Sequence, residues 1–244
     1  MKSRHKWVQY KFMVEHDEMK KYLPKTLLME KDTFVNLIDQ YGDVIIKPDD
    51  GRRGRGVYRI FAIDTNKYEI HHEDRKITVE GKEQTYEYLR DKIGSQKYLV
   101  QRRISLATVQ SRPMDVRVIV QRKKYRDTWK MTAIAVKVAG KGYIVTNIER
   151  SNGTILPFKD AIRKSSLKDY SSGRLMSDIE RICVRSSERL SQLYPHHRIF
   201  GFDIGLDHKG DAWIIEVNRF PMMSHFRKLE DKAMYDRIMK YKES

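Results

Sequence analysis

The stretch "GFDIGLDHKGDAWIIEVNRFP", residues 201–221, most constrains the fold because it places acids inside the most apolar hairpin of the chain. A turn at "DHKGD" joins two strand-like runs, and a four-residue loop would set Asp203 directly opposite Glu216. Glu216 and Asn218 lie two residues apart, so they project from one face of their strand. Two carboxylates this close repel each other unless something cationic lies between them.

Asp203, Glu216 and Asn218 all offer oxygen, the ligand type that Mg²⁺ takes in proteins. A hard divalent ion held by few carboxylates completes its shell with water and phosphate. The alternative is an ordinary sheet with solvated acids on its outer face. Against it, the other positions of the hairpin are mostly apolar: Ile204, Trp213, Ile214, Ile215 and Val217. The hairpin therefore predicts Mg²⁺ together with a nucleotide.

The composition sets the broad class of protein. The 244 residues suffice for one large domain or two small ones, and 40% of them are hydrophobic. No apolar run approaches the roughly 18 residues of a membrane span, and the basic N-terminus lacks the apolar centre of a signal peptide. With a single cysteine, Cys183, these features predict a cytoplasmic protein.

The charge of the chain indicates anionic partners without choosing among them. Lys and Arg outnumber Asp and Glu 49 to 33, a net charge of +16 spread along the whole chain. Such a surface attracts nucleic acid, acidic polymers, nucleotides or membrane lipid.

The order of predicted elements is mixed α and β. Helices are expected at residues 15–23, 31–42, 82–93, 175–194 and 229–241. Strands are expected at residues 43–48, 56–63, 67–72, 76–80, 97–104, 115–122, 128–138 and 142–148, before the hairpin at 201–217. Residues 152–174 read as an irregular connection. Without regular βαβ alternation, we expect two α+β lobes, a smaller one from 20 to 100 and a larger one from 101 to 221, with a ligand cleft between them.

A second candidate site is "VIIKPDDGRRGRGVYRI", residues 44–60. A strand delivers Lys47, and Gly51, Gly54 and Gly56 follow in a loop whose backbone can approach an anion closely. The stretch is neither a Walker loop nor a Rossmann turn, because G-K-[ST] is missing and a strand follows. It is typical of a flap over a nucleotide. A plain surface hairpin and an RNA-contacting "GRRGRG" patch are the alternatives.

Three shorter stretches add weaker signals. The strand "KYLVQRRI" enters a polar loop whose backbone groups could face an adenine. In "MDVRVIV", Asp115 and Arg117 share one face, so Arg117 could brace a phosphate or carboxylate, unless the two form a local ion pair. In "TNIERSNG", Asn147 and Arg150 end a strand near the expected cleft.

Taken in order, these pieces resemble the ATP-grasp fold, most closely its YheC/YheD-like branch of spore-coat-associated proteins. The matches are "YLPKT", "VIIKPDDGRRGRGVYRI", "YLVQRRI", "DVRVIV", "TNIERSNG" and "GFDIGLDHKGDAWIIEVNRFP", from about residue 5 to 221. The acid followed on the next strand by E-x-N is the most specific of them. The resemblance implies one ATP-grasp module over residues 1–244, with a flap-bearing lobe at 20–100, a metal-binding lobe at 101–244 and no full N-terminal pre-ATP-grasp domain.

The resemblance also implies roles for individual residues, with ATP and Mg²⁺ as cofactors. Lys47 would contact the ATP phosphates near the adenine end. The flap would contain Gly51, Arg52, Arg53, Gly54 and Gly56. Adenine would lie against the backbone of Gln101, Arg102, Arg103 and Ile104. The Mg²⁺ ligands would be Asp203, Glu216 and Asn218, and the catalytic residues Arg117, Asn147 and Arg150.

In this family ATP phosphorylates a carboxylate, and an amine attacks the acyl-phosphate to give an amide or peptide bond. The basic surface favours an anionic peptide or polymer as the carboxylate donor, while the amine acceptor is unspecified. The chain departs from related ligases in "NRFPMMSHF" after E-x-N, which reshapes the wall on which the acceptor would lie.

Two other functions fit parts of the sequence. One is an ATP-binding protein without ligase turnover that acts in spore-coat or other assembly. The other is a basic nucleic-acid-binding module, which has no use for the carboxylate cluster and is therefore disfavoured.

Overall fold

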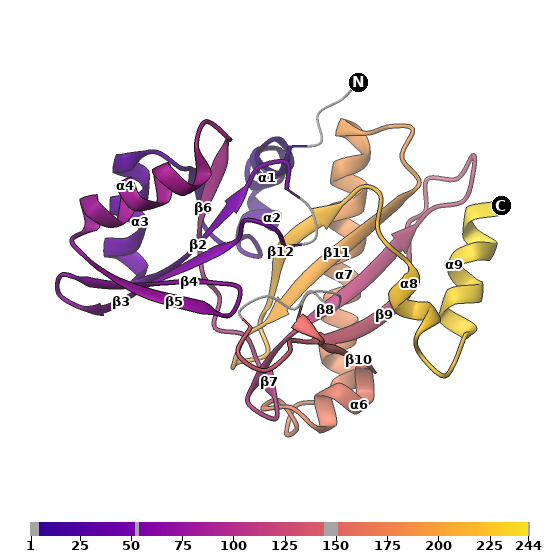
Figure 1. The fold of residues 1–244 in the computed structure, drawn as a ribbon. Coiled ribbons are helices and arrows are strands. Elements are labelled where there is room, and N and C mark those ends of the chain that lie inside the picture. The colour runs from indigo at the N-terminus through magenta and orange to yellow at the C-terminus, as the bar shows by residue number, and fades with distance from the viewer. Residues whose placement is uncertain (1–4, 52–53, 144–150, 244) are drawn as a thin grey trace.

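The computed structural model describes residues 5–51, 54–143 and 151–243, in which two antiparallel sheets are combined with helices (Figure 1). The mixed α and β content expected from the sequence is confirmed. The first sheet has the strand order β1-β6-β2-β3-β4-β5. These strands are β1 (Thr26–Leu28), β6 (Tyr98–Arg102), β2 (Asp43–Pro48), β3 (Tyr58–Asp64), β4 (Lys67–His72) and β5 (Arg75–Glu80).

Helices α3 (Lys31–Tyr41) and α4 (Lys82–Ile93) contribute to one core with the first sheet. On β2 the side chains alternate, so Val44 and Ile46 enter that core while Lys47 projects from the opposite face. The opposite face is therefore the one that can carry polar groups toward a ligand.

The second sheet has the order β10-β9-β8-β11-β12, and β7 pairs with β8 beside this path. Its strands are β10 (Thr154–Pro157), β9 (Lys130–Val138), β8 (Arg112–Gln121), β11 (Ile199–Leu206), β12 (Ala212–Asn218) and β7 (Thr108–Val109). The long helix α7 (Ser172–Leu193) covers one face, with α6 (Phe158–Arg163) beside it, and this face is apolar along its length.

The other face of the second sheet is divided. At one end, α8 (Ser224–Arg227) and α9 (Ala233–Glu243) cover a small core that includes Ile119, Ala133 and Ala135 (Figure 1). At the other end, the same alternation that buries apolar side chains under α7 brings polar ones out: Asp115, Arg117, Lys137, Asp203, Glu216 and Asn218. The sheet thus presents a polar patch bordered by α8.

The expectations for the chain start and for residues 152–174 were wrong. Instead of one helix at 15–23, the structure has α1 (Lys6–Val14) and α2 (Asp17–Lys20). Helix α1 is basic and only weakly amphipathic, and packing against α7, β1 and β12 supports it rather than local pattern. Residues 154–163 form β10 and α6 because β10 pairs with the edge of β9, a long-range contact that local sequence does not reveal. Most of the strand expected at 142–148 lies outside the described residues.

Within the described ranges, none of the helices combines the length and the apolar character needed to cross a bilayer.

The end of α3 gives a test of this fold. Gly42 ends the helix at φ +66°, and a side chain there would have open space but the wrong backbone conformation. We expect Gly42→Ala to lower the free energy of unfolding by about 1 kcal/mol. Gly173, in the first turn of α7, has no left-handed φ, and a Cβ there would make an ordinary contact with Ser171 Oγ at 3.8 Å, so Gly173→Ala should raise stability by about 0.5 kcal/mol. Urea unfolding of both variants measures the two effects, and equal signs would contradict the assigned end of α3.

Candidate functional site

The hairpin of β11 and β12 places Asp203 directly opposite Glu216. Its turn is longer than expected, since Leu206 pairs with Ala212, and a β-bulge after Asp203 restores the register. Asp207 organises the turn by accepting hydrogen bonds from the amides of Lys209 and Asp211, at 2.9 and 3.0 Å, and from the indole of Trp213 at 3.0 Å. The wider turn and the bulge compensate each other, so the two acids still face each other.

The carboxylate of Asp203 is buried among cations of the protein itself. Its Oδ1 lies 2.8 Å from Lys137 Nζ and 3.3 Å from Arg117 Nη2, and its Oδ2 accepts a hydrogen bond from Asn218 Nδ2 at 3.2 Å. Burial raises the pKa of Asp203, but Arg117 and Lys137 outweigh burial and hold this pKa below its usual value. Asp203 is therefore an anion without any bound ligand.

Lys137, which the sequence analysis did not single out, is the central cation of this patch. Its Nζ also lies 3.0 Å from Asp115 Oδ1, so one ammonium bridges two carboxylates. Burial lowers the pKa of Lys137, but attraction to Asp115 and Asp203 exceeds that effect and raises it. The sequence does contain a signal for Lys137. It is a lysine at the end of the apolar strand "MTAIAVK", on the same face of β9 as Ala133 and Ala135, where a charged residue is unusual.

Arg117 uses only part of its guanidinium within the protein. Its Nη2 contacts Asp203, while its buried Nε and Nη1 have no hydrogen-bond partner in the described chain. Gly201 lies beside it and makes room for Pro221, because a Cβ on Gly201 would lie 2.4 Å from Pro221 Cβ and in ordinary contact with Nη1 at 3.4 Å. The local Asp115–Arg117 ion pair considered from the sequence is replaced by two cross-strand pairs, Asp115 with Lys137 and Arg117 with Asp203.

Lys47 links the two sheets. From β2 its Nζ donates to Gln101 Oε1 at 2.8 Å and to the carbonyl of Ile215 on β12 at 3.1 Å. Gln101 in turn donates to Thr26 Oγ1 at 2.8 Å. Burial lowers the pKa of Lys47 to about 8, although the charges of Glu216 and Asp203 oppose this shift. A small pocket opens beside Lys47 between α1 and the two sheets, and Glu216 lines it.

Described parts of the glycine-rich loop have conformations that need glycine. Gly54 and Gly56 have φ of +69° and +66°, and a Cβ on Gly56 would lie 2.5 Å from Tyr98 Oη. The start of the loop is anchored by Lys6 of α1, whose Nζ donates to the carbonyl of Gly51 at 2.7 Å. Arg52 and Arg53 lie outside the described residues, as do Asn147 and Arg150.

The segment from Gln101 to Ile104 connects the two sheets through its side chains. The guanidinium of Arg102 lies 5.1 Å from the ring of Tyr41 and 5.3 Å from the ring of Trp213, on opposite sides of the inter-sheet boundary. The amides of Arg102 and Arg103 donate to the carbonyls of Lys25 and Asp43. These two amides are therefore already used, and fewer backbone groups of the segment remain to bind an adenine.

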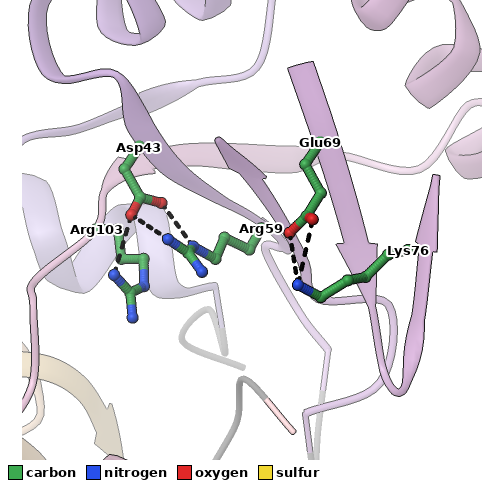
Figure 2. A network of polar contacts seen from close by, with 5 residues as sticks. All are labelled: Asp43, Arg59, Glu69, Lys76 and Arg103. Atoms are coloured by element: carbon green, nitrogen blue, oxygen red, sulfur yellow. Dashed lines mark hydrogen bonds and ion pairs between the residues drawn. The ribbon is translucent and has the colours of Figure 1, made fainter. Parts of the chain in front are cut away.

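Arg103 belongs to a network on the polar face of the first sheet (Figure 2). Asp43 accepts from Arg103 at 3.0 Å and from Arg59 in a bidentate pair at 2.9 and 2.8 Å, while Lys76 pairs with Glu69 nearby. The side chain of Arg103 is therefore held by Asp43. Only the backbone of Arg103 could contact a nucleotide.

His225, to which the sequence analysis assigns no role, lies in the first turn of α8 and is buried. Its neighbour Phe226 packs on Ala135, the β9 partner of Arg117, which sets His225 at the border of the polar patch. Burial, together with the charges of Arg117 and Lys137, lowers the pKa of His225 to about 4. Its Nδ1 has no hydrogen-bond partner within the described part of the chain. The only hint in the sequence was a histidine in the unusual stretch after E-x-N.

The oxygen donors of the hairpin fit a hard divalent cation. The carboxylate of Glu216 forms no ion pair with any residue that the structure describes, and Asp203 Oδ2 is engaged only by the amide of Asn218. Rotation of that amide would turn its oxygen toward the carboxylates. Across the described ranges, no cluster of three or more His, Cys, Asp or Glu could hold a metal, so the remaining ligands would have to come from phosphate and water.

Comparison with known proteins identifies the family of the chain. The model of the YheC/D-like ATP-grasp family matches residues 2–243. The endospore coat-associated protein YheD of Bacillus subtilis is 26% identical over 91% of this chain and 49% of its own length. YheC from the same organism is 21% identical over 88% of this chain and 59% of its own length. The chain thus spans about half the length of the curated relatives that it matches.

Solved structures show the same fold. The ATP-grasp ligase PsnB, in complex with a phosphomimetic variant of its minimal precursor, Mg and ADP, superposes with a TM-score of 0.54 at 16% identity, over 97% of this chain and 58% of PsnB. D-alanyl-alanine synthetase A from Vibrio cholerae gives a TM-score of 0.53 at 12% identity, over 93% and 62% of the two chains. With the family model covering nearly every residue, this chain belongs to the YheC/D-like ATP-grasp family.

Proposed function

We propose that this chain is an ATP-dependent carboxylate–amine ligase that forms an amide or peptide bond through an acyl-phosphate, using Mg²⁺. The observation that carries the proposal is the partly buried polar patch on the second sheet. There the carboxylates of Asp203 and Glu216 lie opposite each other, and Arg117 has two buried donors without partners. Such a site is suited to hold a transferring phosphoryl group.

The nucleotide side of the site lies at the inter-sheet boundary. Lys47 would meet the phosphates, the glycine-rich loop from Gly51 to Gly56 would cover them, and Gln101 to Ile104 would receive adenine through the backbone groups left open. Lys47 is well placed for this role because its ammonium lies between a strand of each sheet. Arg52, Arg53, Asn147 and Arg150 keep the roles that the family resemblance implies.

The chemistry asks for positioning and charge rather than for a covalent intermediate on the protein. The carboxylate oxygen of the donor attacks the γ-phosphorus, ADP leaves with the bridging oxygen, and an acyl-phosphate forms. An amine then attacks the acyl carbon and expels phosphate. Arg117 would stabilise the charge on the phosphoryl oxygens in both steps, since its Nε and Nη1 have no partner in the described chain.

Asp203, Glu216 and Asn218 would hold Mg²⁺, which when bound supplies positive charge beside the phosphates. The donor pool that fits the basic surface best is an anionic peptide or polymer with a free carboxylate, because the chain carries 49 basic against 33 acidic residues. The relatives named as coat-associated make assembly of a protein layer a reasonable setting for such a reaction.

Binding of the nucleotide can be tested without knowing the substrate. We expect millimolar ATP with Mg²⁺ to raise the melting temperature, because a ligand at about 100 times its Kd stabilises the native state by about 2.7 kcal/mol. ATP or Mg²⁺ alone should have a much smaller effect. In Glu216→Gln the shift should shrink while the ligand-free melting temperature changes little, since Glu216 makes no ion pair with the described residues.

Glu188→Gln is the matched control, because it removes the same charge from an exposed position of α7. A thermal shift that does not require Mg²⁺, or that survives in Glu216→Gln as in Glu188→Gln, would contradict the assigned metal site. A normal shift without release of ADP for any carboxylate and amine pair would favour an ATP-binding protein without turnover.

The pH dependence of binding tests Lys47. Phosphate favours the charged ammonium, so binding raises the pKa of Lys47 above its ligand-free value of about 8. The affinity for ATP with Mg²⁺ should therefore be full below pH 8 and fall by up to about tenfold per unit above it. Titration calorimetry from pH 6.5 to 9.5 measures this.

Lys47→Met should bind more weakly and lose this pH dependence, whereas Lys209→Met, at an exposed position of the hairpin turn, should behave as wild type. If affinity in the wild type stays flat between pH 8 and 9.5, Lys47 does not contact the phosphates as a titrating ammonium.

A further inference from the structure

His225 occupies the border between the polar patch and the small core under α8 and α9. The next residue, Phe226, is fully buried in that core with Ile119 and Ala135, and Ala135 pairs directly with Arg117. His225 is therefore held at one wall of the site by the packing of its neighbour. It is 8% exposed, the same value as Arg117.

The polar atoms at this wall lack partners that a folded protein normally supplies. Nδ1 of His225 and both Nε and Nη1 of Arg117 are buried without a hydrogen bond to any described residue. Buried polar groups without partners are rare in native proteins because their desolvation is not compensated. Three such atoms on two residues near Asp203 indicate a place where a polar group of a ligand binds.

The two side chains offer opposite hydrogen-bonding character. Arg117 can only donate, so it suits an oxygen anion. The charges around His225 are Arg117, Lys137, Asp203 and Lys228, and with burial they lower its pKa to about 4. At neutral pH its imidazole is therefore uncharged, and a ring nitrogen can accept a hydrogen bond from an amine. An oxygen anion beside a nitrogen donor is the pair of groups that an amide-forming reaction brings together.

We propose that His225 binds the amine nucleophile, with Nδ1 accepting a hydrogen bond from the attacking nitrogen while Arg117 holds the acyl-phosphate. This inference rests on the proposed ligase function and adds the acceptor subsite to it. The nitrogen lone pair forms the C–N bond, and the bond from carbon to the phosphate oxygen breaks with its electron pair on phosphate. The surplus proton of the nitrogen passes to Nδ1 and from there to water or to the departing phosphate.

Hydroxylamine separates this role from the first half-reaction. It is a small, weakly basic nucleophile that is already unprotonated at neutral pH, so it traps an acyl-phosphate without help from an amine subsite. Wild type and His225→Gln are incubated with Mg²⁺, ATP and N-acetylated peptides ending in Asp, Glu or Ala as acyl donors. The nucleophile is either hydroxylamine or glycinamide, and hydroxamate, amide and ADP are measured.

We expect His225→Gln to form hydroxamate at the wild-type rate within about twofold and to form the glycinamide product about 100-fold more slowly. His208→Gln, at an exposed position in the hairpin turn, should match wild type in both assays. An equal loss with both nucleophiles in His225→Gln would overturn the role of His225 and leave the proposed function intact. Absence of hydroxamate from wild type with every donor would instead overturn the proposed function and this inference with it.

The melting temperature gives a readout that needs no substrate. If His225 is kept for function, His225→Leu removes a buried nitrogen without a partner and should leave the melting temperature unchanged or raise it. A fall of several degrees would show that the imidazole supports the fold and would overturn the inference.

Discussion

The ion pairs of Lys137 with Asp115 and Asp203 are the interaction on which the site depends. A buried carboxylate without a partner costs about 3–5 kcal/mol, and this face of the sheet buries two of them. One ammonium between both acids offsets that cost before any ligand arrives. Arg117 has to neutralise only part of the remaining charge, which leaves its Nε and Nη1 directed at something else. Lys137 thus has a structural role and leaves two donors of Arg117 available for the role proposed above.

Lys47 links the two sheets at the candidate site. The number of its hydrogen-bond donors limits how many further contacts it can make to a ligand. An ammonium has three donors, and Gln101 and the carbonyl of Ile215 use two of them. One donor remains for a phosphate while the link between β2 and β12 persists. The stacking of Arg102 between Tyr41 and Trp213 spans the same boundary. A nucleotide at Lys47 would therefore strengthen an arrangement of the sheets that already exists.

The residue pairing within one hairpin could be predicted from the sequence. Contacts between strands that are distant in the sequence could not. The hairpin at 201–221 showed Asp203 opposite Glu216 because alternation and turn length are local properties, and the bulge happened to compensate the longer turn. Lys137 is 66 residues from Asp203, and only the order β9-β8-β11 brings them together. β10 was missed for the same reason. The position of His225 depends on the packing of Phe226, which lies in a core formed by strands of the second sheet and by α9. Local sequence does not reveal that packing.

If the candidate site binds a nucleotide and a metal as proposed, its charges would make the two binding events depend on each other. Lys47, Arg117 and Lys137 are balanced by Asp115, Asp203 and Glu216, so the patch is close to neutral without a ligand. A triphosphate alone would bring several negative charges toward Glu216, whose carboxylate no described cation pairs. A divalent cation alone would meet acids whose main charge is already offset by Lys137 and Arg117. In the proposed function each ligand would remove the electrostatic penalty of the other, which would explain why a protein with a large positive charge keeps two acids and an amide in its most apolar hairpin.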